Sequence, residues 1–119
     1  MKYLLLLAND ADDIASWEQL DAEAVRKLRV EEVPRWAAVF ERMQADGSYV
    51  DGLELDFPRK AKTVRGDEQI VTDGPYAETK EQIGGFFLVD CASLEEAIEL
   101  AAMVPVAETG SVEIRPLDE

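Results

Sequence analysis

Two short segments of the chain are apolar at nearly every position, and they constrain the fold more than any other feature of the sequence. They are Tyr3 to Ala8 and Gly85 to Cys91. Side chains alternate between the two faces of a strand, so a strand that is apolar throughout is buried on both faces. We therefore expect both segments to be strands of one sheet, with the first in a central position.

A helical pattern follows the first strand. It begins at about Leu20, after a polar and loop-like stretch from Asn9 to Ser16. Pro34 removes a backbone donor from this helix, so a kink or a break is expected there. Beyond it, one apolar stripe repeats at helical spacing and ends at Gly47, a typical helix stop. The stripe consists of Val33, Trp36, Ala37, Phe40 and Met43.

A second helix is predicted between Ser93 and Pro105. Ser93 precedes Glu96 by three positions, which is a capping box, and Pro105 ends the helix. Weaker strand patterns complete the set. The first is Tyr49 to Phe57, where Tyr49, Leu53, Leu55 and Phe57 share one parity. Lys62 to Arg65 and Gln69 to Thr72 flank a G-D-E turn and are predicted to pair as a hairpin. The last is the closing S-V-E-I-R-P-L.

The resulting order is β, α, β, an inserted hairpin, β, α, β. Helices on one side of an antiparallel sheet, with split βαβ connections, define the ferredoxin-like α+β plan. The 119 residues fit one domain over residues 1–119. Two helices cover only one face of the sheet, and a second copy of the chain is the simplest cover for the other. We therefore expect a homodimer in which two sheets pack as a dimeric α+β barrel with a cavity between them.

Composition excludes several classes of protein. Acidic residues number 26 against 12 basic ones, a net charge of −14, so nucleic acid and anionic membrane surfaces are not expected partners. The single cysteine, Cys91, forms no internal disulfide and favours a cytoplasmic location. The opening apolar run is too short for an export signal or a membrane span. With no histidine, zinc lacks its usual ligands, and we expect neither a metal nor a cofactor.

The stretch V-T-D-G-P-Y-A-E-T-K-E-Q-I-G-G-F-F-L-V-D, residues 71–90, carries the candidate site. Asp73, Gly74 and Pro75 form a rigid turn by their backbone chemistry alone. The same turn would hold Asp73 at a cavity mouth as a base, with Lys80 supplying positive charge to an anionic substrate, and a short helical turn over residues 76–80 placing free N–H groups nearby. Both interpretations stand, although Glu78, Lys80 and Glu81 favour a solvated charged edge. Gly84 and Gly85 favour a bend or a close backbone approach at the start of the strand over a phosphate-binding loop.

This stretch, the preceding K-T-V-R-G-D-E-Q, the opening M-K-Y-L-L-L-L and the closing G-S-V-E-I-R-P resemble the YCII-related family over nearly the whole chain, specifically its branch named for a D-G-P-F motif. Tyr76 stands where that motif has phenylalanine. The resemblance implies a ferredoxin-like subunit of a dimeric α+β barrel. It does not imply a particular reaction, since most of this branch has none established. Genes of the branch often lie beside genes for extracytoplasmic-function sigma factors, which implies a regulatory setting. Wider relatives are thought to use a histidine on the first helix, near Trp36 here, and this chain has none.

Two hypotheses follow. In the first, a homodimer binds or transforms a small molecule in its inter-sheet cavity. Asp73 and Lys80 are then the candidate catalytic residues, and the ligand-binding candidates are Tyr3, Trp36, Gly74, Pro75, Tyr76, Phe86 and Arg115. Aromatic residues at positions such as those of Tyr3, Trp36 and Phe86 are more often part of a core than of a ligand pocket. In the second, a non-catalytic accessory protein uses its dimer or its acidic surface to bind a protein partner linked to a sigma factor.

Overall fold

The computed structural model describes residues 1–77 and 79–119, and it has an α+β architecture. The elements in chain order are β1 (Lys2–Asp10), α1 (Ala11–Glu18), α2 (Ala22–Asp46), β2 (Tyr49–Glu54), the 3-10 turn η1 (Pro58–Lys60), β3 (Lys62–Arg65), β4 (Ile70–Asp73), β5 (Glu81–Asp90), α3 (Leu94–Met103), α4 (Val106–Thr109) and β6 (Ser111–Pro116).

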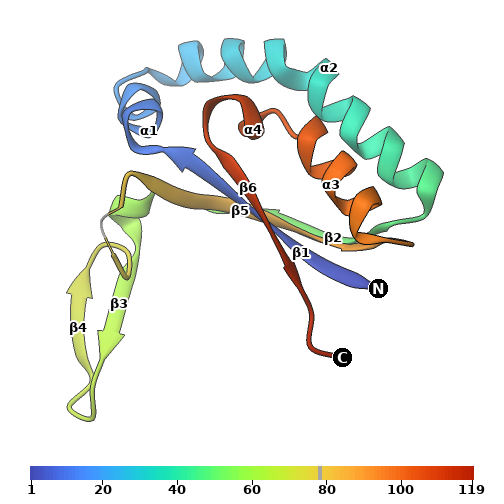
Figure 1. Ribbon diagram of the computed structural model, residues 1–119. Helices are drawn as coiled ribbons and strands as arrows, with labels where there is room; N and C mark the ends of the chain where they lie inside the picture. The colour runs from blue at the N-terminus through green and yellow to red at the C-terminus, as the bar shows by residue number, and fades with distance from the viewer. Residues whose placement is uncertain (78) are drawn as a thin grey trace.

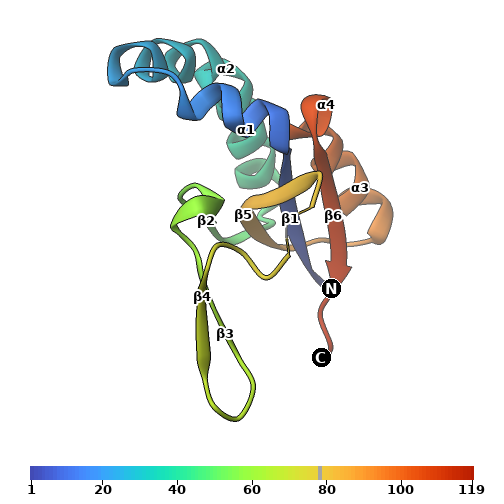
Figure 2. The same cartoon turned by 90° about the vertical axis from the view of Figure 1, so that its left-hand side faces the viewer.

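Four strands form the main sheet in the order β2-β5-β1-β6, and every neighbouring pair is antiparallel. This is the ferredoxin-like order, so the predicted fold class is confirmed, with β1 and β5 in the two central positions. Strands β3 and β4 form the inserted hairpin and pair only with each other. All the α-helices lie on one side of the main sheet, and the hairpin projects away from them (Figures 1 and 2).

The core lies between the helices and one face of the sheet. Strand β1 contributes Tyr3, Leu5 and Leu7, while β5 contributes Phe87 and Val89. Helix α2 adds Val39 and Met43, which are fully buried, and α3 adds Ala97, Leu100 and Ala101. The alternation of buried and partly exposed positions along β1 and β5 shows which residues face the helices.

The opposite face of the sheet is apolar and carries no helix; we call it the open face. Two cross-strand rows define it. One runs Leu53, Phe86, Leu6, Glu113 and the other runs Asp51, Leu88, Leu4, Arg115. Leucine and phenylalanine occupy its centre, while Asp51, Glu113 and Arg115 stand on the outer strands. Within the described residues, nothing in the chain covers this face (Figure 2).

The expected loop from Asn9 to Ser16 is wrong, because α1 begins at Ala11. Asp10 ends β1 and caps α1, since its Oδ2 accepts a hydrogen bond from the backbone N–H of Asp12 at 3.1 Å. Aspartate is among the best N-cap residues, and acidic side chains in a first turn favour a helix. The acidic run was therefore a helix start rather than a solvated loop.

Helix α2 contains Pro34 and continues through it without a break. Its ribbon curves over the sheet along its length (Figure 1). It begins at an Asp21 cap and ends at Gly47, whose φ of 66° is left-handed, as predicted for the stop. The predicted stripe is only partly a core stripe. Met43 is buried, but Val33 and Phe40 are 57% and 46% exposed, because this part of α2 overhangs the sheet.

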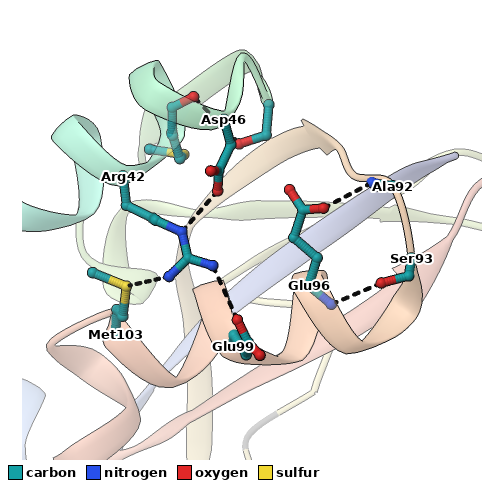
Figure 3. Close-up of polar contacts among 9 residues, drawn as sticks. Arg42, Asp46, Ala92, Ser93, Glu96, Glu99 and Met103 are labelled. Atoms are coloured by element: carbon teal, nitrogen blue, oxygen red, sulfur yellow. Dashed lines mark hydrogen bonds and ion pairs between the residues drawn. The ribbon is translucent and has the colours of Figure 1, made fainter.

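Polar contacts fix α3 against α2 and the end of β5 (Figure 3). The predicted pairing of Ser93 and Glu96 is present, with its second bond one residue earlier than in a standard capping box. Ser93 Oγ accepts from the Glu96 N–H at 3.2 Å, and the Glu96 carboxylate accepts from the N–H of Ala92 rather than of Ser93, at 3.0 Å. Arg42 of α2 donates to Asp46 at 2.7 Å and to Glu99 of α3 at 3.0 Å. These bonds hold the C-terminal half of α2 in place, whereas the N-terminal half is joined to β2 through Arg29 and Glu54.

Strand β2 differs from its predicted pattern. It ends at Glu54 rather than Phe57, and a bulge between Tyr49 and Asp51 changes which face each later residue occupies. Tyr49 packs against Phe40 and Phe87 on the helical side, while Leu53 lies on the open face beside Phe86. The expected single parity is therefore wrong, because a bulge adds one residue and reverses the alternation.

Candidate functional site

A cavity of about 760 Å³ lies between the sheet and the overhanging part of α2. The floor of the cavity is the part of the sheet, on the side facing the helices, where two strand positions are glycines. Gly85 of β5 lies between Glu54 and Leu7 in one cross-strand row, and Gly52 of β2 faces Phe87 in the next. Gly85 has no side chain to fill the space beneath the helix, and the bare backbone of Gly52 makes room for the Phe87 ring.

Aromatic and aliphatic side chains enclose the cavity. Trp36 and Phe40 come from α2, Trp17 from α1, Phe57 from the segment before η1, and Phe87 from β5. The Phe87 ring lies 6.2 Å from that of Trp36 and 5.6 Å from that of Phe40, so three of these rings form one packed wall. An apolar pocket with a few polar groups is the usual form of a small-molecule site.

Two ion pairs join the helices to the edge of the sheet beside the cavity. Arg29 of α2 donates to both carboxylate oxygens of Glu54, at 2.8 and 3.3 Å, and Arg59 of η1 lies 3.3 Å from Glu18 of α1. Hydrogen bonding to Glu54 and its charge raise the pKa of the Arg29 guanidinium. Exposed pairs of this kind are worth about 0–1 kcal/mol, so they orient the helices more than they stabilise them.

Five further polar residues line the cavity: Asn9, Asp13, Glu32, Asp56 and Thr109. The indole N–H of Trp36 donates to a carboxylate oxygen of Glu32 at 3.4 Å. The Asn9 amide lies across Gly84 at the position that a β-carbon there would occupy, so the bare backbone of Gly84 makes room for it. The expected close approach at Gly84 and Gly85 is therefore present.

A second hollow, of about 750 Å³, lies at one end of the open face. Leu6, Asp10, Lys80 and Glu113 are among its lining residues. Lys80 is exposed, and its carbonyl accepts from the backbone N–H of Ala11 at 2.7 Å. This hollow has fewer lining residues than the first and no aromatic wall, so we place the candidate site in the first.

Asp73 lies at the end of β4 and does not line either hollow. Its side chain is 85% exposed and forms an ion pair with Lys62 of β3, not with Lys80. The hydrogen bond from Lys62 and its positive charge lower the pKa of the Asp73 carboxyl. A carboxylate with a lowered pKa is a weaker base. Asp73 therefore lies away from both hollows of the single chain, and its position at the mouth of an inter-sheet cavity, like a catalytic role for Asp73 and Lys80, stays a prediction.

The D-G-P turn closes the base of the hairpin. Gly74 has φ of 94°, its N–H donates to the Ala61 carbonyl at 2.7 Å, and its own carbonyl accepts from Thr63 Oγ1 at 2.9 Å. Pro75 follows it directly, and the Tyr76 ring, 78% exposed, lies under the Arg65 guanidinium at 5.0 Å. The expected turn over residues 76–80 and the charged edge both include Glu78, which lies outside the described residues.

The other predicted site residues are dispersed. Trp36 lines the cavity, and Phe86 contributes to its lining from β5, although alternation directs that side chain to the open face. Tyr3 is buried in the core, and its hydroxyl contacts the Met1 sulfur at 3.7 Å. Arg115 lies on the open face and pairs with Glu113 at 3.1 Å. The nine candidates therefore do not converge on one site.

Sequence reasoning missed Trp17, Phe57 and Asn9 as lining residues. Trp17 was placed after a loop, and its position on α1 could have been found from the Asp10 cap. Phe57 was assigned to a strand that ends three residues earlier. The stripe of α2 carried the clearest signal, because Val33, Trp36, Ala37 and Phe40 all line the cavity.

The titratable groups of the cavity lining are carboxylates and one guanidinium. Among the described residues that form it, they are Asp13, Arg29, Glu32, Glu54 and Asp56, with no cysteine, lysine or tyrosine. In residues 1–77 and 79–119, no group of three or more acidic or cysteine side chains is arranged to hold a metal ion. None of the described helices is both long enough and apolar enough to cross a membrane.

The strand order and the single helical layer define a ferredoxin-like α+β protein with an inserted hairpin. The profile of the YCII-related domain family matches residues 1–119, so the chain belongs to that family. It is also 38% identical over 121 residues to the uncharacterized protein R00369 of Rhizobium meliloti (strain 1021), an alignment that covers 98% of this chain and 92% of that protein. That relative's name assigns it no activity.

Proposed function

We propose that the protein binds a small, flat and largely apolar molecule in the cavity between α2 and the sheet. The observation that carries this proposal is the wall of Trp17, Trp36, Phe40, Phe57 and Phe87 around a volume of about 760 Å³. Known ligand pockets span about 300–1,000 Å³ and are lined mainly by apolar and aromatic side chains. The site lies within one chain, whereas the sequence had suggested a cavity between the sheets of two chains.

The proposal differs from a catalytic one in its chemistry. The carboxylates beside the cavity can accept protons or hydrogen bonds, and Asp13 and Glu32 are half-buried. No nucleophilic thiol or amine accompanies them in the described lining. Recognition of a ligand therefore requires fewer groups than a reaction would, and binding is the simpler function for this set of residues.

The test uses N-phenyl-1-naphthylamine, an uncharged probe that fluoresces in apolar sites. We expect saturable binding of one probe per chain, together with a change in the intrinsic fluorescence, because both tryptophans of the protein line the cavity. Ala37→Trp on the cavity side of α2 should fill the space and weaken binding at least tenfold. Ala38→Trp is the matched control, since Ala38 is exposed and outside the lining.

The outcomes are distinct. Saturable binding that Ala37→Trp removes and Ala38→Trp retains supports the proposal. Unsaturable binding, or equal binding by both variants, contradicts it. Circular dichroism and thermal melting of each variant check that the helix is intact.

We further propose that the protein is a homodimer assembled through the open face. The supporting observation is the pair of apolar rows centred on Leu4, Leu6, Phe86 and Leu88, which the described chain leaves uncovered. Large exposed apolar patches are rare on monomers and mark interaction sites. The flat shape agrees with this assembly, since the principal extents are 44 × 41 × 20 Å.

A further inference from the structure

The ligand class follows from charge as well as from shape, and the inference here rests on the proposed function. Among the described residues that line the cavity, four are carboxylates, namely Asp13, Glu32, Glu54 and Asp56, and Arg29 is the one basic side chain. The walls are aromatic and the charged groups are almost all of one sign. A ligand must satisfy both properties at once.

The carboxylates are not equally available to a ligand. Glu54 is neutralised by Arg29 in a two-point ion pair at 2.8 and 3.3 Å. Asp56 pairs with Lys60 at 3.0 Å and accepts from the backbone N–H of Phe57 at 2.7 Å. These two residues already have cationic partners within the chain, so they contribute little to recognition of a further charge.

Asp13 and Glu32 remain. Each is half-buried, and neither has a basic group within 4.0 Å in the described part of the chain. Glu32 accepts a hydrogen bond from the Trp36 indole N–H at 3.4 Å and interacts at longer range with Arg29. Asp13 lies in the first turn of α1, one helical turn before Trp17. Glu32 therefore contacts one indole of the cavity lining, and Asp13 lies one helical turn along α1 from the residue that carries the other.

We infer that the cavity selects an aromatic or aliphatic cation, such as an organic ammonium compound, over neutral and anionic molecules of the same shape. A cation over an indole face is attracted by the ring, more strongly as water is excluded, and Asp13 and Glu32 provide counter-charges at the same walls. The net charge of −14 adds an attractive field for a cation. An anion would meet half-buried carboxylates and unfavourable desolvation.

The test compares three ligands with one ring system: (2-naphthylmethyl)trimethylammonium, 2-methoxynaphthalene and 2-naphthoate. Calorimetric titration of the intact protein at low ionic strength should give a dissociation constant at least tenfold lower for the ammonium than for the neutral ether, with the naphthoate weakest. The advantage of the ammonium should shrink in 0.5 M salt, because screening weakens charge interactions at a partly exposed site.

Variants separate charge from shape. Glu32→Gln and Asp13→Asn should each raise the dissociation constant of the ammonium severalfold and leave that of the ether unchanged. Glu31→Gln is the matched control, since Glu31 is exposed and lies outside the lining. Equal effects of Glu31→Gln and Glu32→Gln would show a general surface field and would overturn the inference.

Failure of this inference differs from failure of the proposed function. Equal binding of all three ligands, or tightest binding of the naphthoate, overturns the cation preference but keeps the apolar site. Binding of none of the three, together with no binding of the neutral fluorescent probe, overturns both.

Discussion

Gly84 and Gly85 are neighbours in β5, yet an added methyl group would meet a different obstacle at each. At Gly85 it would lie 2.8 Å from the backbone carbonyl oxygen of Leu53 in the paired strand. At Gly84 it would meet the amide end of the Asn9 side chain, which can rotate away. The two positions therefore separate a fixed obstacle from a movable one.

We predict that Gly85→Ala lowers the free energy of unfolding by about 1–3 kcal/mol, the usual cost of overpacking, because β2 must shift. Gly84→Ala should cost less, since only Asn9 moves, and it should alter ligand binding more than stability. Urea denaturation of both variants, with the probe titration beside it, measures the two effects. Equal stability losses at the two positions would contradict this account.

Cys91 is a buried thiol at the end of β5, 2% exposed. Burial raises its pKa, and the charges of Glu96, Asp46 and Asp90 act in the same direction. We predict slow alkylation by iodoacetamide at pH 8 in the native protein and rapid alkylation in urea, because the thiolate is the reactive form. Rapid alkylation of the native protein would show that this end of the sheet opens readily.

The raised pKa also sets a pH dependence of stability. The contribution of the protonated thiol is complete below the thiol pKa of the unfolded chain, about 8.5, and is lost as the pH rises through the higher pKa of the folded state. Wild type should therefore lose stability above about pH 9 relative to Cys91→Ala, whose residue does not ionise. Denaturant midpoints of both proteins from pH 7 to 10 measure the difference.

At the scale of the element, α2 combines a fixed half and an overhanging half. Pro34 lies within the overhanging part, between Val33 and Trp36 of the cavity lining, and a proline in a helix interior costs about 3 kcal/mol relative to alanine. We predict that Pro34→Ala stabilises the protein and raises its melting temperature by several degrees, because a backbone hydrogen bond is restored. A lower melting temperature would show instead that packing requires the curvature of α2.

Predictions from the sequence succeeded for elements whose pattern depends on local chemistry. The two apolar strands, the Ser93–Glu96 pairing and the Gly47 stop were all found where expected. The errors arose where the same residue type suits two structures, or where a strand contains an irregularity. Asp10 belonged to a polar run but capped a helix, and the bulge in β2 reversed the parity that the apolar residues of this segment share in the sequence.

At the scale of the whole molecule, the candidate site was predicted only in part. Trp36 and the α2 stripe indicated either a core or a pocket, and the structure places them around a cavity. The cavity itself depends on side chains that are missing, at Gly52 and Gly85, and on how far α2 overhangs the sheet. Such features come from the packing of distant segments, so no local pattern in the sequence could reveal them.

The homodimer is the prediction that belongs to this scale. Leu88→Lys places a charge on the open face beside Asp51, its cross-strand neighbour, so the single chain should fold. We expect wild type to be a dimer by size-exclusion chromatography with light scattering, and Leu88→Lys to be a monomer. Val30→Lys, at a 63% exposed position on α2, should remain a dimer. A monomeric wild type would contradict the assembly.

The chain leaves the main sheet after β2, forms the β3–β4 hairpin, and returns to the sheet in β5 next to the point where it left. The N–H of Leu55, just after β2, donates to the carbonyl of Gly84 in β5 at 2.8 Å. The segment between Leu55 and Gly84, which contains the β3–β4 hairpin, is therefore a loop whose two ends are joined by this hydrogen bond. We therefore expect changes in the length of the β3–β4 hairpin, which carries the D-G-P turn, to leave the order of the four-stranded sheet unchanged.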